Sequence, residues 1–276
     1  MEHSINCSNQ GPLPTAGRVE PVYGLFEPRE TRMTDVRLTP TTISGWLSCE
    51  HSLSLAVRRS AGESFTVQPP GSFSDLLRAK GETHERDCFA RYLADGKKVE
   101  TIDSQRRDTG ETFEQWVQRI GNPLEATDAD VLYQVPFISR GIRGIADFIE
   151  RVEHPDPGAA SWEAVDAKLA RREGKPGHVL QLSFYSECIE SLTGTSPRSM
   201  HLELGSKSRE SFLTEHFAAY WRRISCELID QIASTGEPVA TLPEPCDHCY
   251  FCDFQPHCTS YWRETDSLTL VADMAK

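Results

Sequence analysis

Apolar residues recur at the three- and four-residue spacing of amphipathic helices in several parts of the chain. In the first of these parts, Thr41 or Thr42 can cap a helix whose apolar residues include Ile43, Trp46 and Leu53. The same spacing marks four further segments as helical, at 72–93, 111–120, 178–192 and 209–234.

Short runs rich in β-branched and aromatic residues lie between these helices and predict strands. They occupy 131–138, 144–152, 162–170 and 200–205. The first three follow one another through short connections, which predicts an antiparallel meander. The order of helices, meander, helix, strand and helix predicts an α/β domain with a mixed central sheet flanked by helices.

Composition places the chain among soluble globular proteins. Of its 276 residues, 38% are hydrophobic and 25% are charged, which is enough apolar material for a proper core. The sequence has no run of 18 apolar residues and no secretory leader pattern, so we expect a cytoplasmic protein with no membrane partner. Residues 1–35, rich in Gly, Pro and Ser, predict a flexible arm, and 36–276 a single domain.

The net charge of −12 argues against a protein that coats nucleic acid through a broad basic surface. It does not exclude an enzyme that holds nucleic acid only in a cleft. Any basic contacts with a polyanion are therefore expected to be local.

Two of the predicted strands carry carboxylates where a buried strand favours Val or Ile. Asp166 and Lys168 share one face because side chains two apart in a strand point the same way. If the two strands pair, Asp147 lies beside Asp166. Such a pair repels unless it takes up a proton or a cation, and Mg²⁺ or Mn²⁺ prefers oxygen ligands. Lys168 can then orient an attacking water or stabilise charge on a phosphate. The alternative is a set of ion pairs with Lys168 or Arg171.

The helix that follows adds two polar residues to a mainly apolar stripe. Gln181 and Tyr185 are four residues apart and so share one helix face. Taken alone, Tyr185 is better explained by core packing.

Together, Asp147, Asp166-Ala-Lys168 and Gln181-Leu-Ser-Phe-Tyr185 resemble the motifs of the PD-(D/E)XK nuclease superfamily, in its RecB-like branch. His84, in KGETHERDCFA, matches the upstream histidine of that branch. The resemblance implies a restriction-endonuclease-like core in which His84, Asp147 and Asp166 bind Mg²⁺ or Mn²⁺. It also implies that Lys168 assists the attacking water, while Gln181 and Tyr185 support the site and its DNA contact. Two neighbouring carboxylates, Glu85 and Glu163, are second choices.

A cysteine cluster near the carboxyl end indicates a metal or iron–sulfur site. The spacing over 246–258 is C-x2-C-x2-C-x5-C, and nine cysteines without an export signal do not suggest a disulfide framework. Zinc and an iron–sulfur cluster both remain open on spacing alone. The candidate zinc ligands are Cys246, Cys249, Cys252, Cys258, His248 and His257.

The resemblance favours the cluster. RecB-like nucleases of the CRISPR-adaptation and AddB type hold a [4Fe–4S] cluster with one early cysteine and a C-terminal C-x2-C-x5-C. Cys49, Cys249, Cys252 and Cys258 match that pattern, which leaves Cys246 surplus. Residues 242–262 would then form an iron–sulfur cap that joins the N- and C-terminal parts of the domain.

These features predict a metal-dependent DNA nuclease, an exonuclease on single-stranded or end-bearing DNA. A helicase or another DNA-processing subunit is a candidate partner. The alternative is a non-catalytic nucleic-acid-binding or scaffold subunit of a repair or CRISPR-type complex that retains the cluster. A zinc-bound structural protein is a third hypothesis.

Overall fold

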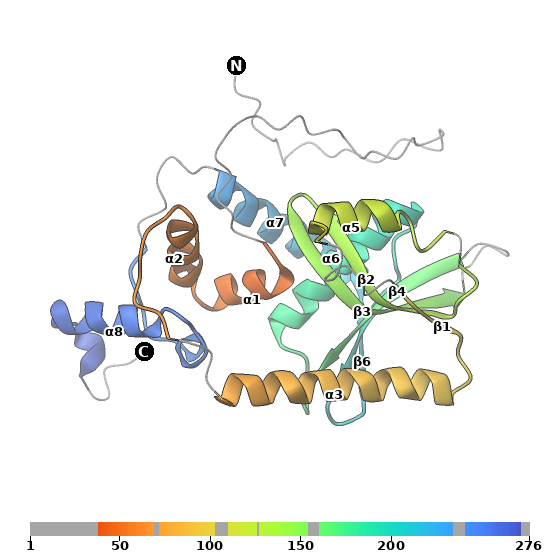
Figure 1. Ribbon diagram of the computed structural model, residues 1–276, viewed down its shortest axis with the longest axis horizontal. Helices are drawn as coiled ribbons and strands as arrows, with labels where there is room; N and C mark the ends of the chain where they lie inside the picture. Colours follow the sequence, from red (N-terminus) through yellow and green to blue (C-terminus); the bar gives the residue numbers. More distant parts are fainter. Residues whose placement is uncertain are drawn as a thin grey trace, which may run out of the picture.

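The computed structural model describes residues 38–68, 72–102, 110–125, 127–153, 160–233 and 241–271, so the predicted N-terminal arm lies outside the described residues. A six-stranded mixed sheet carries helices on both faces, and a smaller helical lobe stands at one end (Figure 1). None of the described helices is long and apolar enough to cross a membrane.

The strands lie side by side in the order in which they occur along the chain. They are β1 (Val99–Thr101), β2 (Val131–Ser139), β3 (Ile142–Glu153), β4 (Ala160–Lys168), β5 (Ser199–Leu204) and β6 (Arg209–Leu213). The antiparallel pairing of β2, β3 and β4 confirms the predicted meander, while β1 pairs with β2 and β4 with β5 in parallel. β1 was not predicted, because three residues carry too little periodicity to be recognised.

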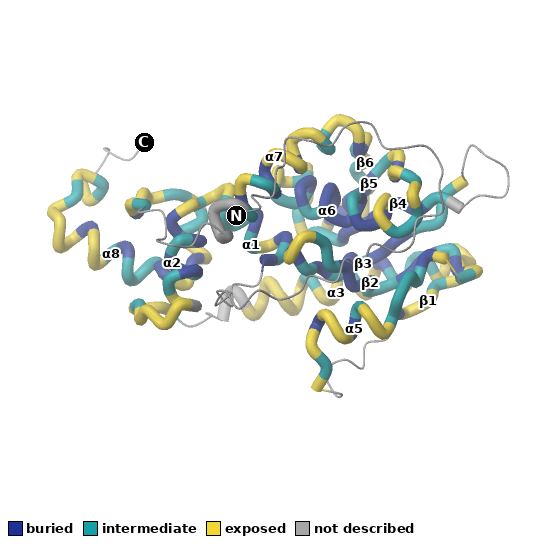
Figure 2. Tube along the Cα trace, turned by 90° about the horizontal axis from the view of Figure 1, so that it is seen from above, coloured by how far each residue is buried: buried dark blue, intermediate teal, exposed yellow. Residues whose placement is uncertain are grey.

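Helices cover the two faces of the sheet unequally. One face packs against α6 (Pro176–Thr193), together with α1 (Pro40–Ser48) and α7 (Thr214–Ala233). The short helix α5 (Phe113–Ile120) lies beside β2. On the opposite face lies α3 (Ser72–Ala94), which packs through residues such as Cys88 and is exposed along much of its length (Figures 1 and 2).

α6 is the central crossover helix, and its sequence is apolar on nearly every side. Leu182, Phe184 and Ile189 are fully buried between the sheet and the neighbouring helices. Close approach to β3 depends on Gly144, because a Cβ there would lie 2.9 Å from the rings of both Phe184 and Tyr185. The position of α6 on β3 is therefore fixed by close packing at Gly144.

The first helical region is broken in two, which its apolar spacing did not predict. α1 ends at Ser48 and α2 (Glu50–Ser60) begins two residues later. Cys49 lies between them in an extended conformation, with φ of −159°, and its N–H donates to the Gly45 carbonyl at 2.8 Å. The break turns α2 away from the sheet.

The helix predicted over 209–234 was wrong in its first five residues. Arg209–Leu213 forms the edge strand β6, antiparallel to β5, and α7 starts only at Thr214. The exposed and half-buried positions alternate along β6, as expected for an edge strand. Pairing with the backbone of β5 therefore outweighs the helical propensity of this short segment.

An early and a late segment of the described residues meet in the smaller lobe. The C-terminal segment contains η1 (Asp247–Tyr250), α8 (Gln255–Glu264) and η2 (Leu268–Leu270), and α2 packs against residues of η1, α8 and the turn between them. Their shared core is separate from that of the sheet and consists of Leu55, Cys252, Phe254, Cys258 and Trp262.

Candidate active site

In both β2 and β3, the alternation of side chains between the two faces of the sheet is broken, and the two breaks lie side by side. Leu132 and Val135, three apart in β2, both contact the core on the α6 side of the sheet, and so do Ala146 and Ile149 in β3. In a regular strand, residues three apart point to opposite faces. The register omits the intervening Gln134 and Asp147, and Gln134 has a φ of 60° in the left-handed region. The sheet is thus interrupted where Asp147 projects.

This interruption brings together the carboxylates predicted from the sequence. Phe148 is opposite Val165, so Asp147 and Asp166 are level on neighbouring antiparallel strands. Asp147 Oδ2 accepts a hydrogen bond from the Ala167 N–H at 2.8 Å, directly between Asp166 and Lys168. Lys168 Nζ lies 2.5 Å from Asp166 Oδ2. The three groups therefore form one cluster, as the strand pattern predicted.

The two buried carboxylates repel each other and shift the pKa values of the cluster. Burial, and then the Asp166 carboxylate, raise the pKa of Asp147 well above its usual value. Burial alone would lower the pKa of Lys168, but Asp166 and Asp147 raise it overall, so this side chain stays an ammonium at neutral pH. A second positive charge would relieve the carboxylate pair.

Gln181 and Tyr185 reach the cluster from α6. Gln181 Nε2 donates to Asp166 Oδ1 at 3.2 Å and to the Tyr185 hydroxyl at 3.2 Å. The Tyr185 hydroxyl in turn donates to the Ile145 carbonyl at 2.7 Å, next to the interrupted part of β3. Both side chains therefore hold the orientation of Asp166 and tie α6 to the sheet.

His84 projects from α3 on the other face of the sheet. Its Nε2 lies 2.9 Å from the carbonyl oxygen of Glu203 in β5. A carbonyl can only accept, so Nε2 carries the proton and Nδ1 presents a lone pair. Metal-binding histidines commonly have this arrangement, in which the non-ligating nitrogen is fixed by a carbonyl.

Glu85, the neighbour of His84, interacts with the carboxylate cluster through its charge. It contributes to the raised pKa of Asp147 and of Lys168. Its carboxylate accepts from the Tyr133 hydroxyl at 2.8 Å and from the side chain of Gln134. Sequence reasoning missed these β2 partners, although a Gln within the apolar run VLYQVPFI was a visible signal.

Glu163, the other second-choice carboxylate, has a different environment. It accepts from the Ser199 N–H at 2.8 Å, and its other oxygen lies 2.8 Å from His201 Nε2. His201 Nδ1 lies 2.8 Å from the Ser211 hydroxyl. These bonds satisfy a buried carboxylate between β4, β5 and β6, so Glu163 is a structural residue.

The predicted cysteine set converges in the smaller lobe. Cys49, Cys249, Cys252 and Cys258 line one small cavity between α2 and the C-terminal segment. Cys246 is close by, with its sulfur 3.9 Å from that of Cys249. Residues some 200 positions apart in the chain are thus neighbours in space.

The thiols lie in surroundings that disfavour ionisation without a cation. Burial, and then charges on Cys252, Cys249 and Cys49, raise the pKa of Cys258 to about 12. The pKa of Cys49 is likewise raised, first by burial. Because the thiolate is the metal ligand, binding of a metal or cluster would have to drive off these protons.

The two donor sets, carboxylates in the sheet and thiols in the smaller lobe, suit different cations. Asp166 Oδ2 is buried and lies 2.5 Å from the Lys168 ammonium, so this oxygen already faces a positive charge. Together with Asp147 it offers the oxygen donors that Mg²⁺ or Mn²⁺ prefers. Four converging thiols are the donor set of zinc or an iron–sulfur cluster. Within the described residues, no three His, Cys, Asp or Glu side chains are drawn together as closely as ligands of a single bound ion.

Comparison with known families agrees with this geometry. The family model of the PD-(D/E)XK nuclease superfamily matches residues 71–259, which include α3 and every strand of the sheet. The chain therefore belongs to the PD-(D/E)XK nuclease superfamily. Its mixed sheet flanked by helices fits the predicted restriction-endonuclease-like core. No curated protein sequence matches the chain.

Proposed function

We propose that this protein is a divalent-metal-dependent DNA nuclease of the RecB-like branch, acting as an exonuclease on single-stranded or end-bearing DNA. The observation that carries the proposal is the convergence of Asp147, Asp166 and Lys168 at the interruption of β3. Because the chain belongs to a nuclease superfamily, we interpret this cluster as the site of phosphodiester cleavage.

Asp147 and Asp166 would hold Mg²⁺ or Mn²⁺, with His84 as a further ligand from α3. A cation bound there supplies positive charge to the scissile phosphate and makes water a better nucleophile. The crowding that raises the pKa of Asp147 supports this assignment, because a cation offsets the repulsion between the carboxylates.

Lys168 acts through its charge in this proposal. Without a bound cation, Asp166 and Asp147 raise the pKa of Lys168, which favours a role through its charge over that of a general base. Its ammonium is instead a donor that orients the attacking water and stabilises charge developing on the phosphate. Gln181 and Tyr185 keep Asp166 in place through their linked hydrogen bonds.

The cysteines Cys49, Cys249, Cys252 and Cys258 would hold a [4Fe–4S] cluster, with zinc as the alternative metal. Support comes from their convergence on one cavity and from the match to the C-x2-C-x5-C pattern. The role of the cluster is structural, joining α2 to the C-terminal segment.

Cleavage assays test the catalytic proposal. Anaerobically purified protein is incubated with end-labelled single-stranded and duplex DNA in the presence of Mn²⁺, beside the Lys168→Ala variant. We expect the wild type to shorten DNA from an end, and the variant to be at least roughly 100-fold slower, as for loss of a charge-stabilising donor.

The result also distinguishes the rival hypothesis. If the wild type binds DNA but does not cleave it while the cluster is intact, the protein is a binding or scaffold subunit. Cleavage unchanged in the Lys168→Ala variant would remove this site from the reaction. A helicase or other DNA-processing partner is a further part of the proposal, tested by purification of the complex from cells.

A further inference from the structure

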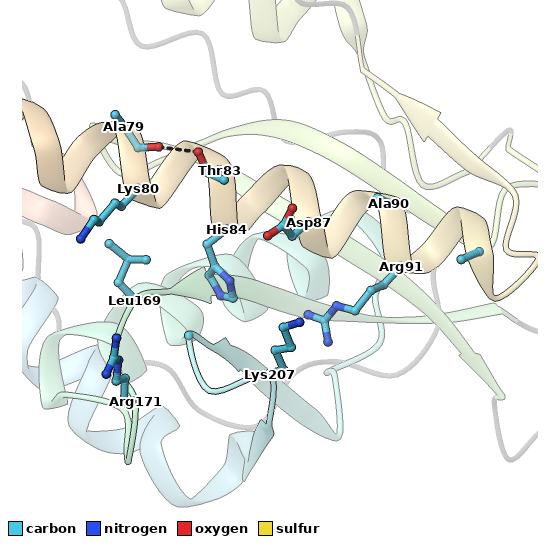
Figure 3. A pocket seen from close by; sticks show the side chains of 12 residues that line it. Ala79, Lys80, Thr83, His84, Asp87, Ala90, Arg91, Leu169, Arg171 and Lys207 are labelled. Atoms are coloured by element: carbon cyan, nitrogen blue, oxygen red, sulfur yellow. Dashed lines mark hydrogen bonds between the residues drawn. The ribbon is translucent and has the colours of Figure 1, made fainter.

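A basic groove lies beside the candidate active site, between α3 and the segments that follow β4 and β5. Its volume is about 770 Å³. Lys80 and His84 line it from α3, Leu169 and Arg171 from the end of β4, and Lys207 from the β5–β6 turn. Figure 3 shows His84 pointing from α3 toward the space that Leu169, Arg171 and Lys207 border.

The groove continues directly from the catalytic strand. Leu169 follows Lys168 in the chain, and the Gly205 N–H donates to the Ala170 carbonyl at 2.9 Å. A Cβ at Gly205 would lie 2.8 Å from the Leu169 carbonyl oxygen, so the turn packs against this segment without room for a side chain. The floor of the groove and Lys168 therefore belong to one continuous part of the sheet.

The charge of the groove is opposite to that of the protein. Lys80, Arg171 and Lys207 are all exposed, and none forms an ion pair with a described residue. Arg91 is neutralised by Glu203, 2.7 Å away, which leaves Asp87 as the acidic group of the lining. Unpaired cations gathered in one concave site contrast with the overall charge of −12.

The backbone at Lys207 adds an independent observation. Its φ of 69° lies in the left-handed region, which costs a residue with a Cβ some conformational energy. Gly or Asn would suit this turn better. The turn thus fixes the backbone that carries Lys207 at the edge of the groove.

We propose that this groove holds the phosphate backbone of a single nucleic-acid strand next to the scissile phosphate, an inference that rests on the proposed nuclease function. Lys and Arg side chains are the usual partners of phosphates. The lining includes no aromatic side chain on which bases could stack, so recognition is independent of sequence. The volume is room for a short stretch of one strand.

Binding measurements without cleavage test the groove. Full-length protein in EDTA is titrated with a fluorescent single-stranded oligonucleotide at several salt concentrations. The double variant Lys207→Gln/Arg171→Gln is compared with the control Lys97→Gln/Arg222→Gln, which removes the same charges from exposed positions outside the groove. All four side chains are exposed, and thermal melts confirm that each variant is folded.

We expect the groove variant to bind about 20-fold more weakly at 0.1 M salt, since each phosphate contact on a single strand contributes roughly 0.7 to the salt exponent. The slope of log affinity against log salt falls by roughly 1.4 in this variant. The control changes neither quantity by more than about twofold. Blunt duplex DNA binds more weakly than the single strand.

Equal losses in the groove and control variants would overturn the groove proposal, and so would an unchanged salt slope. Parallel cleavage assays in Mn²⁺ separate the two proposals. If the wild type cleaves DNA and the groove variant binds it with undiminished affinity, the nuclease proposal holds and the groove proposal is rejected. A wild type that neither binds nor cleaves any DNA overturns both.

Discussion

In the candidate site, the proton position, orientation or charge of each key side chain is set by its immediate neighbours. The Glu203 carbonyl fixes the proton of His84 on Nε2, and the Ala167 N–H fixes one oxygen of Asp147. Lys168 remains charged because Asp166 and Asp147 outweigh the cost of its burial. At the scale of residues, then, the chemistry is prepared by backbone groups as much as by other side chains.

The tautomer of His84 leads to a prediction about metal affinity. With Nδ1 as the ligand, the His84→Ala variant should raise the Mn²⁺ concentration for half-maximal cleavage by roughly 10–100-fold. Glu85→Gln is the comparison, since Glu85 already accepts bonds from Tyr133 and Gln134, and its effect should be smaller. Titration of Mn²⁺ into both variants measures this directly. A larger loss in Glu85→Gln would make Glu85 the ligand from α3.

Between elements, two contacts hold the site together on opposite faces of the sheet. On one face α6 packs against β3 at Gly144 without room for a Cβ. On the other face, Arg209 of β6 spans the sheet to Glu150 of β3, beneath Tyr92 of α3. The first contact positions Gln181 and Tyr185, and the second holds α3 against the sheet.

Substitution of Gly144 tests the packing of α6. A Cβ 2.9 Å from Phe184 and Tyr185 must displace the helix, so Gly144→Ala should lower the free energy of unfolding by about 1–3 kcal/mol. Activity should fall with it, because Gln181 loses its hold on Asp166. Gly81→Ala, in a helix with open space around it, is the control and should be neutral or slightly stabilising. Equal stability of both variants in denaturant titrations would contradict the packing argument.

The ion pair of Glu150 predicts a dependence of stability on pH. Burial would raise the pKa of Glu150, but its bonds to Arg209, at 2.6 and 2.8 Å, lower it overall. A lowered pKa stabilises the fold above the unfolded value near 4.5, and this contribution is lost as the pH falls through the folded value.

The Glu150→Gln variant measures that contribution. We expect a loss of about 2 kcal/mol at pH 7 that shrinks toward zero as the pH falls through the lowered pKa of folded Glu150. Glu227→Gln, which removes an exposed partner 3.8 Å from Arg223, should change stability by less than about 0.5 kcal/mol. A difference between wild type and Glu150→Gln that stays constant with pH would exclude a charge effect.

For the molecule as a whole, the notable feature is the contact between α2 and the last described segment of the chain. Cys49 follows the first described helix, and its partners lie beyond residue 245. Gln68 strengthens the junction, since its N–H donates to the Asp253 carbonyl at 2.8 Å and its side chain to the Cys252 carbonyl at 3.0 Å. A cluster bound here would close a loop that contains the entire sheet.

Loss of one thiol tests this closure. Cys49→Ser should abolish absorbance near roughly 400 nm and the bound iron and sulfide, and should lower the Tm by several degrees. Cys246→Ser, which removes the surplus cysteine, should retain the colour. Loss of colour in Cys246→Ser alone would reassign the ligands. A colourless wild type containing zinc would replace the cluster with a metal ion.

The sequence by itself determined the elements and residues whose signals are local. The meander, α3 and α6 were predicted because their apolar periodicity is long enough to recognise, and β6 was missed because five residues fit a strand or a helix equally well. Strand spacing placed Asp166 and Lys168 on one face, beside Asp147 if the strands pair, and helix spacing did the same for Gln181 and Tyr185. Their grouping into one candidate site came from the resemblance to nuclease motifs.

Only the tertiary structure decided what depends on distant parts of the chain. The interruption at Gln134 and Asp147 arises from the mutual pairing of two strands, and the Nε2 proton of His84 from a carbonyl in β5. The basic groove likewise gathers charges from three separate segments. The spacing of residues along the sequence does not predict such contacts, because they depend on how the strands pair and on which helix covers each face of the sheet.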